Sequence, residues 1–262
     1  MKIAVCIKQV PDTNEIKLDP VTGTLIREGV PSIINHDDKS GIEAALRLAE
    51  ETEGTVTAVC MGPPQADLAL REALAMGCHD AVLVSAREFG GSDTYATATI
   101  LSAALKRIGY DLVITGRQAI DGDTAQVGPQ IAENLGIPQV SYVEKIDLEG
   151  EKLIVMRQFE DRYHIIEVKP PCLLTVLQEF AKPRYMSIKG IGRAYKTDIK
   201  QFNFDSLKDY LDPAHIGLKG SPTNVFKSFT KQIKGQGIKL TNLSSDEAVK
   251  VIMDKLEELH VL

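Results

Sequence analysis

The stretch Asp111-Leu-Val-Ile-Thr-Gly-Arg-Gln-Ala-Ile-Asp-Gly-Asp-Thr-Ala-Gln-Val-Gly-Pro-Gln130 decides the fold, because an apolar run passes through a polar, glycine-bearing turn into a helix start. Leu112 to Ile114 are apolar, Val113 and Ile114 are β-branched, and the run is short enough for a parallel strand that is covered on both faces. Gly116 ends that strand. A strand followed by such a turn predicts a ligand-binding edge.

The turn itself predicts a phosphate site. Its glycines allow close backbone approach, and free amides at a helix start attract phosphate through the helix dipole. Because proline suits the first position of a helix, we expect the helix to begin at Pro129, which leaves Asp121 to Gly128 as a phosphate-cradling loop. The alternative is an ordinary loop, capped by Asp123 or Thr124, that binds nothing.

Composition bounds the class of protein. The 262 residues are 44% hydrophobic and 25% charged, as in a soluble globular protein. No apolar run approaches the roughly 20 residues that span a bilayer, and Met1 to Ile7 is too short for a signal peptide and predicts a first strand. The four cysteines have no Cys-x-x-Cys spacing, which favours reduced core residues of a cytoplasmic protein over a metal site or disulfides.

Charge is unevenly distributed. The chain has a net charge of -6, yet basic residues outnumber acidic ones between Lys182 and Leu240, with interleaved aromatics. Such a segment could contact nucleic acid, lie across an acidic partner or form a solvated surface. Nucleic acid is disfavoured, because no glycine-aromatic RNA motif or zinc spacing accompanies the charge.

Strands and helices alternate in the first half of the chain. We predict strands over 2–8, 55–61, 81–85 and 111–115, with helices over about 37–52, from 63 to 77, over about 92–108 and up to 136. This order implies an α/β fold with a Rossmann-like doubly wound parallel sheet. Ligands of such sheets lie at the carboxyl ends of strands. Those ends are Lys8, Met61-Gly62, Ser85 and Gly116.

The pattern changes after Pro138. Short strands expected over 140–147, 152–159, 163–168 and 172–176 alternate with period two, which predicts an antiparallel extension over about 139–177 of a nucleotide-binding domain 1–185. Residues 186–262 are expected to form a C-terminal arm with helices over about 222–234 and 245–259, the last opened by the capping-box spacing Ser244-Ser-Asp-Glu247. With few apolar residues from 187 to 221, this arm is expected to pack on another chain.

Common catalytic motifs are absent from the sequence. There is no Gly-x-Gly-x-x-Gly after the first strand, no Walker-type loop and no Ser-Gly-Gly-x-Asp-Ser loop, which disfavours a generic dehydrogenase, an NTPase or an ATP pyrophosphatase. The five histidines lie in unrelated contexts. We therefore predict no catalytic side chain and no metal ligand.

Five segments carry a resemblance to a known family. They are Lys2-Ile-Ala-Val-Cys-Ile-Lys-Gln-Val-Pro-Asp-Thr13, Ala73-Leu-Ala-Met-Gly77, Gly116-Arg-Gln-Ala-Ile-Asp-Gly-Asp-Thr-Ala-Gln126, Val155 to Thr175, and Lys182-Pro-Arg-Tyr185. On these the chain resembles the β subunit of electron-transfer flavoproteins over essentially its full length. Arg162 and His164 depart from the family pattern, but both lie in the predicted extension, away from the expected cofactor pocket.

The resemblance implies an adenine nucleotide alpha hydrolase-like fold and a heterodimer with a larger α subunit that carries one FAD. In ordinary family members the β subunit holds a structural AMP. In a bifurcating branch it holds a second FAD, which accepts hydride from NADH. One electron then passes to ferredoxin or flavodoxin, and the other passes through the α-subunit FAD to an acyl-CoA dehydrogenase-type flavoenzyme. Val10 to Thr13 and Asp121 to Thr124 look like markers of that branch, so FAD is favoured, with AMP as the alternative.

Carried over by position, the resemblance gives a set of cofactor-binding residues. They are Cys6, Asn35, His36, Asp37, Asp38, Met61, Arg117, Gln118, Ala119, Ile120, Asp121, Gly122, Asp123, Thr124, Ala125, Gln126, Val127 and Gly128. Arg117 could face phosphate or flavin, or form a salt bridge. Asp121 and Asp123 would repel phosphate, so turn capping or ribose contacts suit them better.

Two further segments receive roles from the resemblance. Val10, Pro11, Asp12 and Thr13 are candidates for the NADH site, with plain loop chemistry as the alternative. Phe180, Lys182, Pro183, Arg184 and Tyr185 match the loop by which family members dock onto acyl-CoA dehydrogenases. There Phe180 takes the position of the apolar anchor, and its alternative is a buried loop residue.

Two other functions stay open at this stage. The chain could be a non-catalytic scaffold that holds AMP and supports an α subunit that shuttles single electrons. It could also be a stand-alone, stress-type nucleotide-binding module. The C-terminal arm, which is poorly suited to fold alone, argues against the latter.

Overall fold

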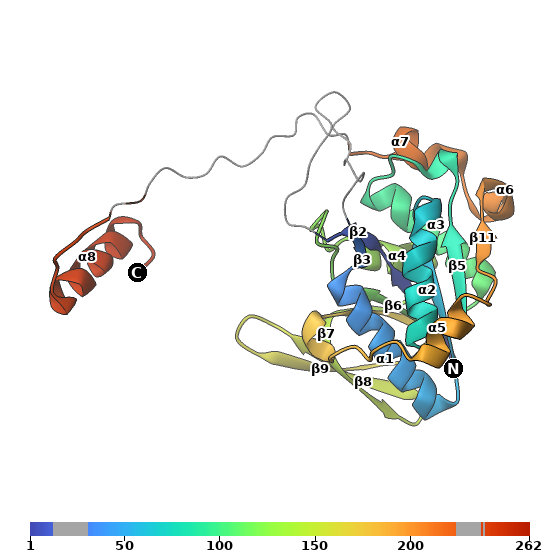
Figure 1. Cartoon of the computed structure of the whole chain (residues 1–262), viewed down its shortest axis with the longest axis horizontal. Helices are drawn as coiled ribbons and strands as arrows, with labels where there is room; N and C mark the ends of the chain where they lie inside the picture. Colours follow the sequence, from blue (N-terminus) through green and yellow to red (C-terminus); the bar gives the residue numbers. More distant parts are fainter. Residues whose placement is uncertain (13–30, 224–236, 238) are drawn as a thin grey trace. The chain divides into compact units, whose positions relative to one another are not determined.

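The computed structural model describes residues 1–12, 31–223, 237 and 239–262 (Figure 1). The chain forms two compact units, Met1–Phe226 and Lys227–Leu262. The strands are β1 Lys2–Ile7, β2 Gln9–Pro11, β3 Ser32–Ile34, β4 Thr55–Met61, β5 Asp80–Val84, β6 Leu112–Gly116, β7 Gln139–Glu149, β8 Lys152–Gln158, β9 Tyr163–Val168, β10 Cys172–Val176 and β11 Lys200–Phe202. The α-helices are α1 His36–Thr52, α2 Asp67–Met76, α3 Thr94–Ile108, α4 Val127–Leu135, α5 Ile188–Ala194, α6 Phe204–Leu207, α7 Gly217–Gly220 and α8 Ser245–Glu258. Five short 3-10 helices complete the elements: η1 Pro64–Ala66, η2 Arg87–Phe89, η3 Gln178–Phe180, η4 Lys208–Tyr210 and η5 Pro213–His215.

The first unit is built on one sheet of nine strands, in the order β11-β5-β4-β1-β6-β10-β7-β8-β9. The strands from β11 to β10 pair in parallel, and β10 pairs in parallel with the start of β7. The pairs β7–β8 and β8–β9 are antiparallel. The predicted α/β fold with a largely parallel sheet and antiparallel strands is therefore confirmed.

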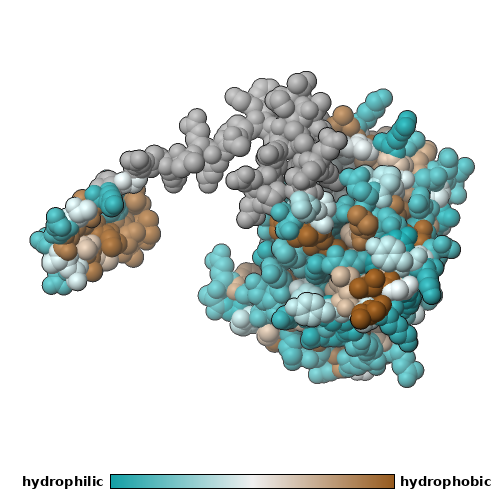
Figure 2. Space-filling view, viewed as in Figure 1, coloured by the Kyte–Doolittle hydropathy of each residue, from teal (hydrophilic) through white to brown (hydrophobic). Residues whose placement is uncertain are grey.

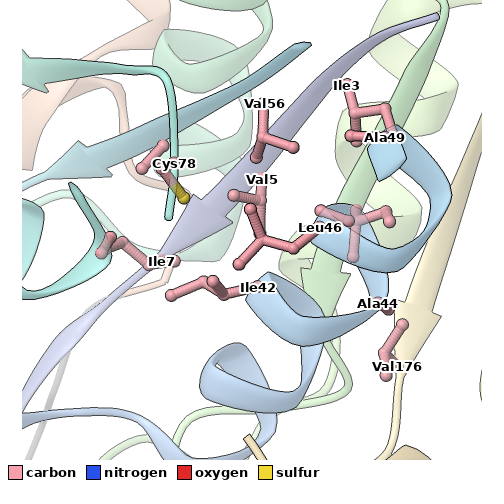
Figure 3. Packing of buried hydrophobic residues seen from close by; sticks show 14 of the residues in the cluster. Ile3, Val5, Ile7, Ile42, Ala44, Leu46, Ala49, Val56, Cys78 and Val176 are labelled. Atoms are coloured by element: carbon pink, nitrogen blue, oxygen red, sulfur yellow. The ribbon is translucent and has the colours of Figure 1, made fainter. Parts of the chain in front are cut away.

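Helices cover both faces of the parallel strands. Along β1 the side chains of Ile3, Val5 and Ile7 pack in the cluster that holds α1 and α2, as Figure 3 shows for Ile42 and Leu46 of α1. The intervening Ala4 and Cys6 pack in a second cluster, with α3 and α4. Since successive strand residues point to opposite faces, one strand contributes to two cores. This is the doubly wound arrangement that the sequence predicts.

The predicted antiparallel extension is wrong for its last strand, β10. It pairs in parallel with β6 and with β7, and all five of its residues are buried. A strand covered on both faces is a continuous apolar run, so the alternation expected over 172–176 does not apply. The antiparallel part consists of β7, β8 and β9.

Helix α4 begins at Val127, two residues before the predicted start at Pro129. Proline is tolerated there because the amides of the first turn have no partner within the helix. Val127 and Gly128 consequently belong to the first turn of the helix, and the loop that precedes it is shorter than expected.

The first unit extends beyond the predicted domain boundary at residue 185. Strand β11 pairs with β5 as an edge of the sheet, and α5 packs against α2, where Arg71 Nη1 donates to Ala194 O at 2.7 Å. Residues 186–223 thus belong to the first unit rather than to a separate arm. Of the helix expected over 222–234, residues 224–234 lie outside the described part of the chain. Helix α8 and its capping box at Ser244 and Glu247 are confirmed.

Candidate functional site

A cavity of about 1060 Å³ lies at the carboxyl ends of β1, β4, β5 and β6. Cys6, Met61, Val84 and Thr115 reach it from these strands, and the turn after β6 lines it as far as Gly128. Ligands of doubly wound sheets bind at this edge, outside the carboxyl ends of the strands. The cavity is therefore where the strand-end pattern places the site.

The cavity brings together most of the residues that the resemblance singled out. Those that line it are Cys6, Asp38, Met61, Arg117, Gln118, Ala119, Gly122, Asp123, Thr124, Ala125, Gln126, Val127 and Gly128. Those that do not are Asn35, His36, Asp37, Ile120 and Asp121. In the second group, His36 and Ile120 are exposed, whereas Asn35, Asp37 and Asp121 contact residues that line the cavity.

Asn35 holds the turn after β6 in place. Its amide Nδ2 donates to the backbone oxygen of Gln118 at 2.8 Å, and its Oδ1 accepts from the amide of Ile120 at 3.2 Å. The side chain is fully buried. Asn35 therefore positions Gln118 and its neighbours along the cavity instead of lining it.

Asp38 joins the ends of two strands. One carboxylate oxygen accepts from the amide of Gly116 at 3.0 Å, and the other accepts from the amide of Lys8 at 2.8 Å. Burial raises the pKa of this carboxyl to about 7, although the two amides favour its charged form. The carboxylate holds β1 and β6 at the spacing that shapes the floor of the cavity.

Two cations beside the cavity already have acidic partners. Lys8 Nζ lies 2.6 Å from Asp121 Oδ1, and Arg117 Nε lies 3.3 Å from the buried Asp37 Oδ2. Burial raises the pKa of Asp37, and Arg117 opposes that rise. Arg117 thus combines two of the roles expected for it, since it forms an ion pair and also lines the cavity.

The loop between Arg117 and α4 is shaped for close approach. Asp123 and Ala125 have φ angles of 55° and 53°, which few residues other than glycine adopt. Strained backbone of this kind is typical of functional loops. A Cβ on Gly128 would lie 2.7 Å from both Thr115 Oγ1 and Thr175 Cγ2, so the first turn of α4 sits directly on the strands. Amides of this turn are available to an anion.

Sequence reasoning missed a second wall of the cavity. This wall consists of Pro63, Pro64, Gln65, Ser85, Ala86, Arg87, Phe89, Gly90, Gly91, Ser92, Asp93, Thr94, Thr97 and Leu101. Only Ser85 was singled out, as a strand end. The signal was present in Gly90-Gly-Ser-Asp-Thr94, which leads from β5 into α3 in the same strand, turn and helix order as the stretch after β6.

The candidates for the NADH site lie beside β1. Val10 and Pro11 are buried in the two-stranded sheet of β2 and β3, and the amide of Asp12 donates to Pro31 O at 2.7 Å. Thr13 lies outside the described residues. None of Val10, Pro11 and Asp12 lines the cavity.

The docking segment has a different exposed residue from the one expected. Phe180 is half-buried and packs against the core, as in the alternative for this residue. Arg184 Nε donates to Glu43 Oε2 at 2.8 Å, and this pairing with Glu43 and Glu50 raises the pKa of Arg184 above its usual range. The exposed apolar side chains are Tyr185 and Ile188, at 87% and 91%.

The four cysteines are buried, and none forms a disulfide. Burial raises the pKa of Cys6, which lines the cavity, to about 12, so its thiol stays protonated and unreactive. Among residues 1–12, 31–223, 237 and 239–262, no helix has both the length and the apolar character required to cross a membrane.

The fold and the site define an α/β protein of the doubly wound class, with a large cavity at the carboxyl ends of its parallel strands. The comparisons narrow this class. Residues 22–207 match the family described as electron transfer flavoprotein domain, so the chain belongs to the electron transfer flavoproteins.

The relatives resemble the chain over its whole length. The electron transfer flavoprotein subunit beta of Thermoanaerobacterium thermosaccharolyticum is 56% identical, and that of Clostridium acetobutylicum is 53% identical, each over 100% of both chains. The caffeyl-CoA reductase-Etf complex subunit CarD of Acetobacterium woodii is 53% identical, also over 100% of both chains. The family and subunit type that the sequence motifs predict are therefore confirmed.

Proposed function

We propose that this β subunit binds FAD in the cavity and that this FAD accepts hydride from NADH. One electron passes to a low-potential acceptor, ferredoxin or flavodoxin, and the other passes through an FAD of the α subunit to an acyl-CoA dehydrogenase-type flavoenzyme. A β subunit implies an α subunit as partner. The alternative is a β subunit with a structural AMP.

The size of the cavity is the observation that carries the proposal. At about 1060 Å³ it lies at the upper end of the range of about 300–1,000 Å³ for small-molecule pockets. One wall after β6 and a second wall from the turns after β4 and β5 flank it. An AMP would fill only part of this space, whereas a dinucleotide has a second half to occupy the remainder.

The lining suits the parts of such a ligand. Met61, Val84 and Leu101 offer an apolar end for an aromatic base, and the amides at the start of α4 offer donors for phosphate. The flavin supplies the hydride and electron chemistry, while the protein binds and orients it. Lys8 and Arg117 are already paired with carboxylates. On the cavity wall after β6, the backbone amides are therefore the principal groups that would stabilise the negative charge of a phosphate.

Relatives support the choice of electron acceptor. One is named as part of a caffeyl-CoA reductase-Etf complex, and another, from Anaerotignum propionicum, is an acryloyl-CoA reductase electron transfer subunit gamma, 52% identical over 100% of both chains. Both names join an electron-transfer subunit to a reductase of a CoA thioester. We infer an acceptor of the same chemical class for this chain.

Helix α8 supports an α subunit as partner. Its apolar residues gather along one side of the helix (Figure 2), and Val249, Ile252 and Met253 are all exposed. An amphipathic helix is stabilised mainly by packing its apolar face. We propose that the α subunit covers this face, as part of the C-terminal arm.

The heterodimer provides the test. The chain is co-purified with its α partner, and nucleotides are released with acid and identified by mass. Two FAD per heterodimer, with bleaching of both flavins by NADH, would support the proposal, whereas one FAD and one AMP would overturn it. Replacing both Thr124 and Gln126 by glutamate should abolish retention in the β cavity by repelling phosphate, while Gln201→Glu, at an exposed position on β11, should not.

A further inference from the structure

The second wall of the cavity is held by a segment far along the chain. We call Gly217–Thr223 the latch. Within it, the amide of Leu218 donates to Gly90 O at 3.0 Å, and Ser221 Oγ accepts from the amide of Asp93 at 2.9 Å. The amide of Thr223 donates to Asp93 Oδ2, also at 2.9 Å. The latch therefore binds two residues that line the cavity.

Asp93 connects the latch to the cavity and to a helix. As the N-cap of α3, it accepts from the amide of Ala96 at 3.0 Å through Oδ1, while Oδ2 serves the latch. Burial raises the pKa of this carboxyl, but the amides of Ala96 and Thr223 outweigh that effect and lower it overall. The start of α3 and the Gly90–Asp93 turn are consequently fixed by the same side chain.

The latch fits its seat closely. Gly217 has a φ of 62°, and a Cβ there would lie 2.2 Å from Glu88 O, on the η2 turn. Ser221 is buried, and its hydroxyl donates to Gly217 O at 2.7 Å. A buried hydroxyl with both a donor and an acceptor partner specifies one geometry. The latch is therefore a closely packed and hydrogen-bonded part of the first unit.

The latch is also where the C-terminal arm leaves the first unit. The chain continues from Thr223 towards α8, whose apolar face we assign to the α subunit. The latch is thus the described part of the first unit that lies nearest to α8 along the chain. Leu211 and Ile216, which precede the latch, also pack in the cluster that holds Phe89 and Leu101 of this wall.

We propose that the latch couples docking of the C-terminal arm on the α subunit to retention of the nucleotide in the cavity. The proposal rests on the proposed partner for α8 and on nucleotide binding, but not on which nucleotide is bound. Both docking and binding favour the state in which Asp93 is bonded to Ser221 and Thr223. Each then strengthens the other, because coupling between two sites is reciprocal.

The test measures how fast the co-purified nucleotide leaves the intact heterodimer after dilution. Ser221→Ala leaves the amide of Asp93 without its partner and should speed release about tenfold. Ser221→Thr keeps the hydroxyl and should release at the wild-type rate. Ser206→Ala is the control, since its hydroxyl also donates to a backbone oxygen, that of Asn203, but on α6 away from the cavity. Melting temperatures show whether each variant is folded.

A second pair of variants tests the coupling. Ile252→Asp weakens the apolar face of α8 and should speed release when the latch is intact, but should add nothing in the Ser221→Ala background. Release that is unchanged in Ser221→Ala, unchanged in Ile252→Asp, or increased independently by both substitutions would overturn the coupling. The identity of the released nucleotide, read by mass, separately decides between FAD and AMP, so failure of the proposed function is distinguishable.

Discussion

Gly116, the last residue of β6, has no room for a side chain. A Cβ there would lie 2.2 Å from Asp38 Oδ1 and 2.9 Å from the backbone nitrogen of Asp38. The amide of Gly116 donates to that same carboxylate. Glycine is required at this position because a strand end and a helix start meet there, not because the turn needs a left-handed conformation.

Gly116→Ala should therefore destabilise the protein. The inserted methyl overlaps backbone that cannot move freely, so we expect a loss of about 1–3 kcal/mol in the free energy of unfolding, or more. Gly192→Ala is the control, because a Cβ there has no neighbour within 4 Å and alanine favours a helix. The free energy of unfolding of both variants is compared through their urea denaturation midpoints, provided that the slope m of the transition is unchanged. Equal midpoints for the two variants would contradict the assigned contact.

Asp38 makes stability depend on pH. Since burial raises its pKa from the usual 3.8 to about 7, the folded state binds the proton more tightly than the unfolded state. The contribution of this group to stability is fully present below 3.8 and is lost as the pH rises towards 7. Groups with lowered pKa, such as Asp93, act in the opposite direction.

Comparing the wild type with Asp38→Asn isolates this effect, because the other groups are common to both proteins. Asparagine presents an amino group to one of two backbone donors, so the variant should be less stable throughout. The stability advantage of the wild type should shrink as the pH rises from about 5 to 7 and then stay constant. If the urea midpoints of the two proteins instead changed in parallel between about pH 5 and pH 7, Asp38 would not titrate in this range.

At the scale of elements, the segment from Tyr185 into α5 presents apolar side chains to solvent. Ile188, the first residue of α5, is 91% exposed, while Phe180 is packed on the core and Arg184 is tied to Glu43 on α1. Helix α5 itself packs against α2, and an exposed apolar side chain on a fixed element is typical of an interface anchor. Ile188 is therefore a better candidate for docking than Phe180.

Ile188→Asp should impair transfer to the proposed acyl-CoA dehydrogenase-type partner. Loss of an anchor costs about 2 kcal/mol or more, so the KM for that partner should rise about thirtyfold, while bleaching of the flavins by NADH should be unchanged. Tyr210→Asp, at another exposed position of the first unit, serves as the control. An unchanged KM in Ile188→Asp would move docking to another surface.

At the scale of the whole molecule, the first unit collects its cavity from distant parts of the chain. Its floor comes from β1 and β6 at the centre of the sheet, one wall comes from the turn after β6, and the other comes from the turns after β4 and β5. The latch comes from beyond β11. Residues 217–223 therefore contact the wall of a cavity whose floor includes residues near the N-terminus. Helix α8 leaves apolar residues exposed, which suits a subunit that is completed by a partner.

The sequence by itself determined the local elements and the family. Apolar runs repeat with the period of a strand or a helix, and glycine stops and capping residues mark where the elements end. Strands β1, β4, β5 and β6 and helices α1 to α4 and α8 could therefore be predicted from neighbours in the chain. Motifs such as Gly116 to Gln126 identified the subunit type. The cavity wall after β6 followed from the same local signals.

Only the tertiary structure decided which residues line the cavity and which support it. These contacts join residues that are far apart in sequence. They are the pairing of β10, the support of the turn by Asn35, the hydrogen bonds from two strands to Asp38, the packing of the half-buried Phe180 on the core, and the latch on Asp93. Local periodicity cannot specify such contacts, because burial and hydrogen bonding depend on which elements meet once the sheet has formed.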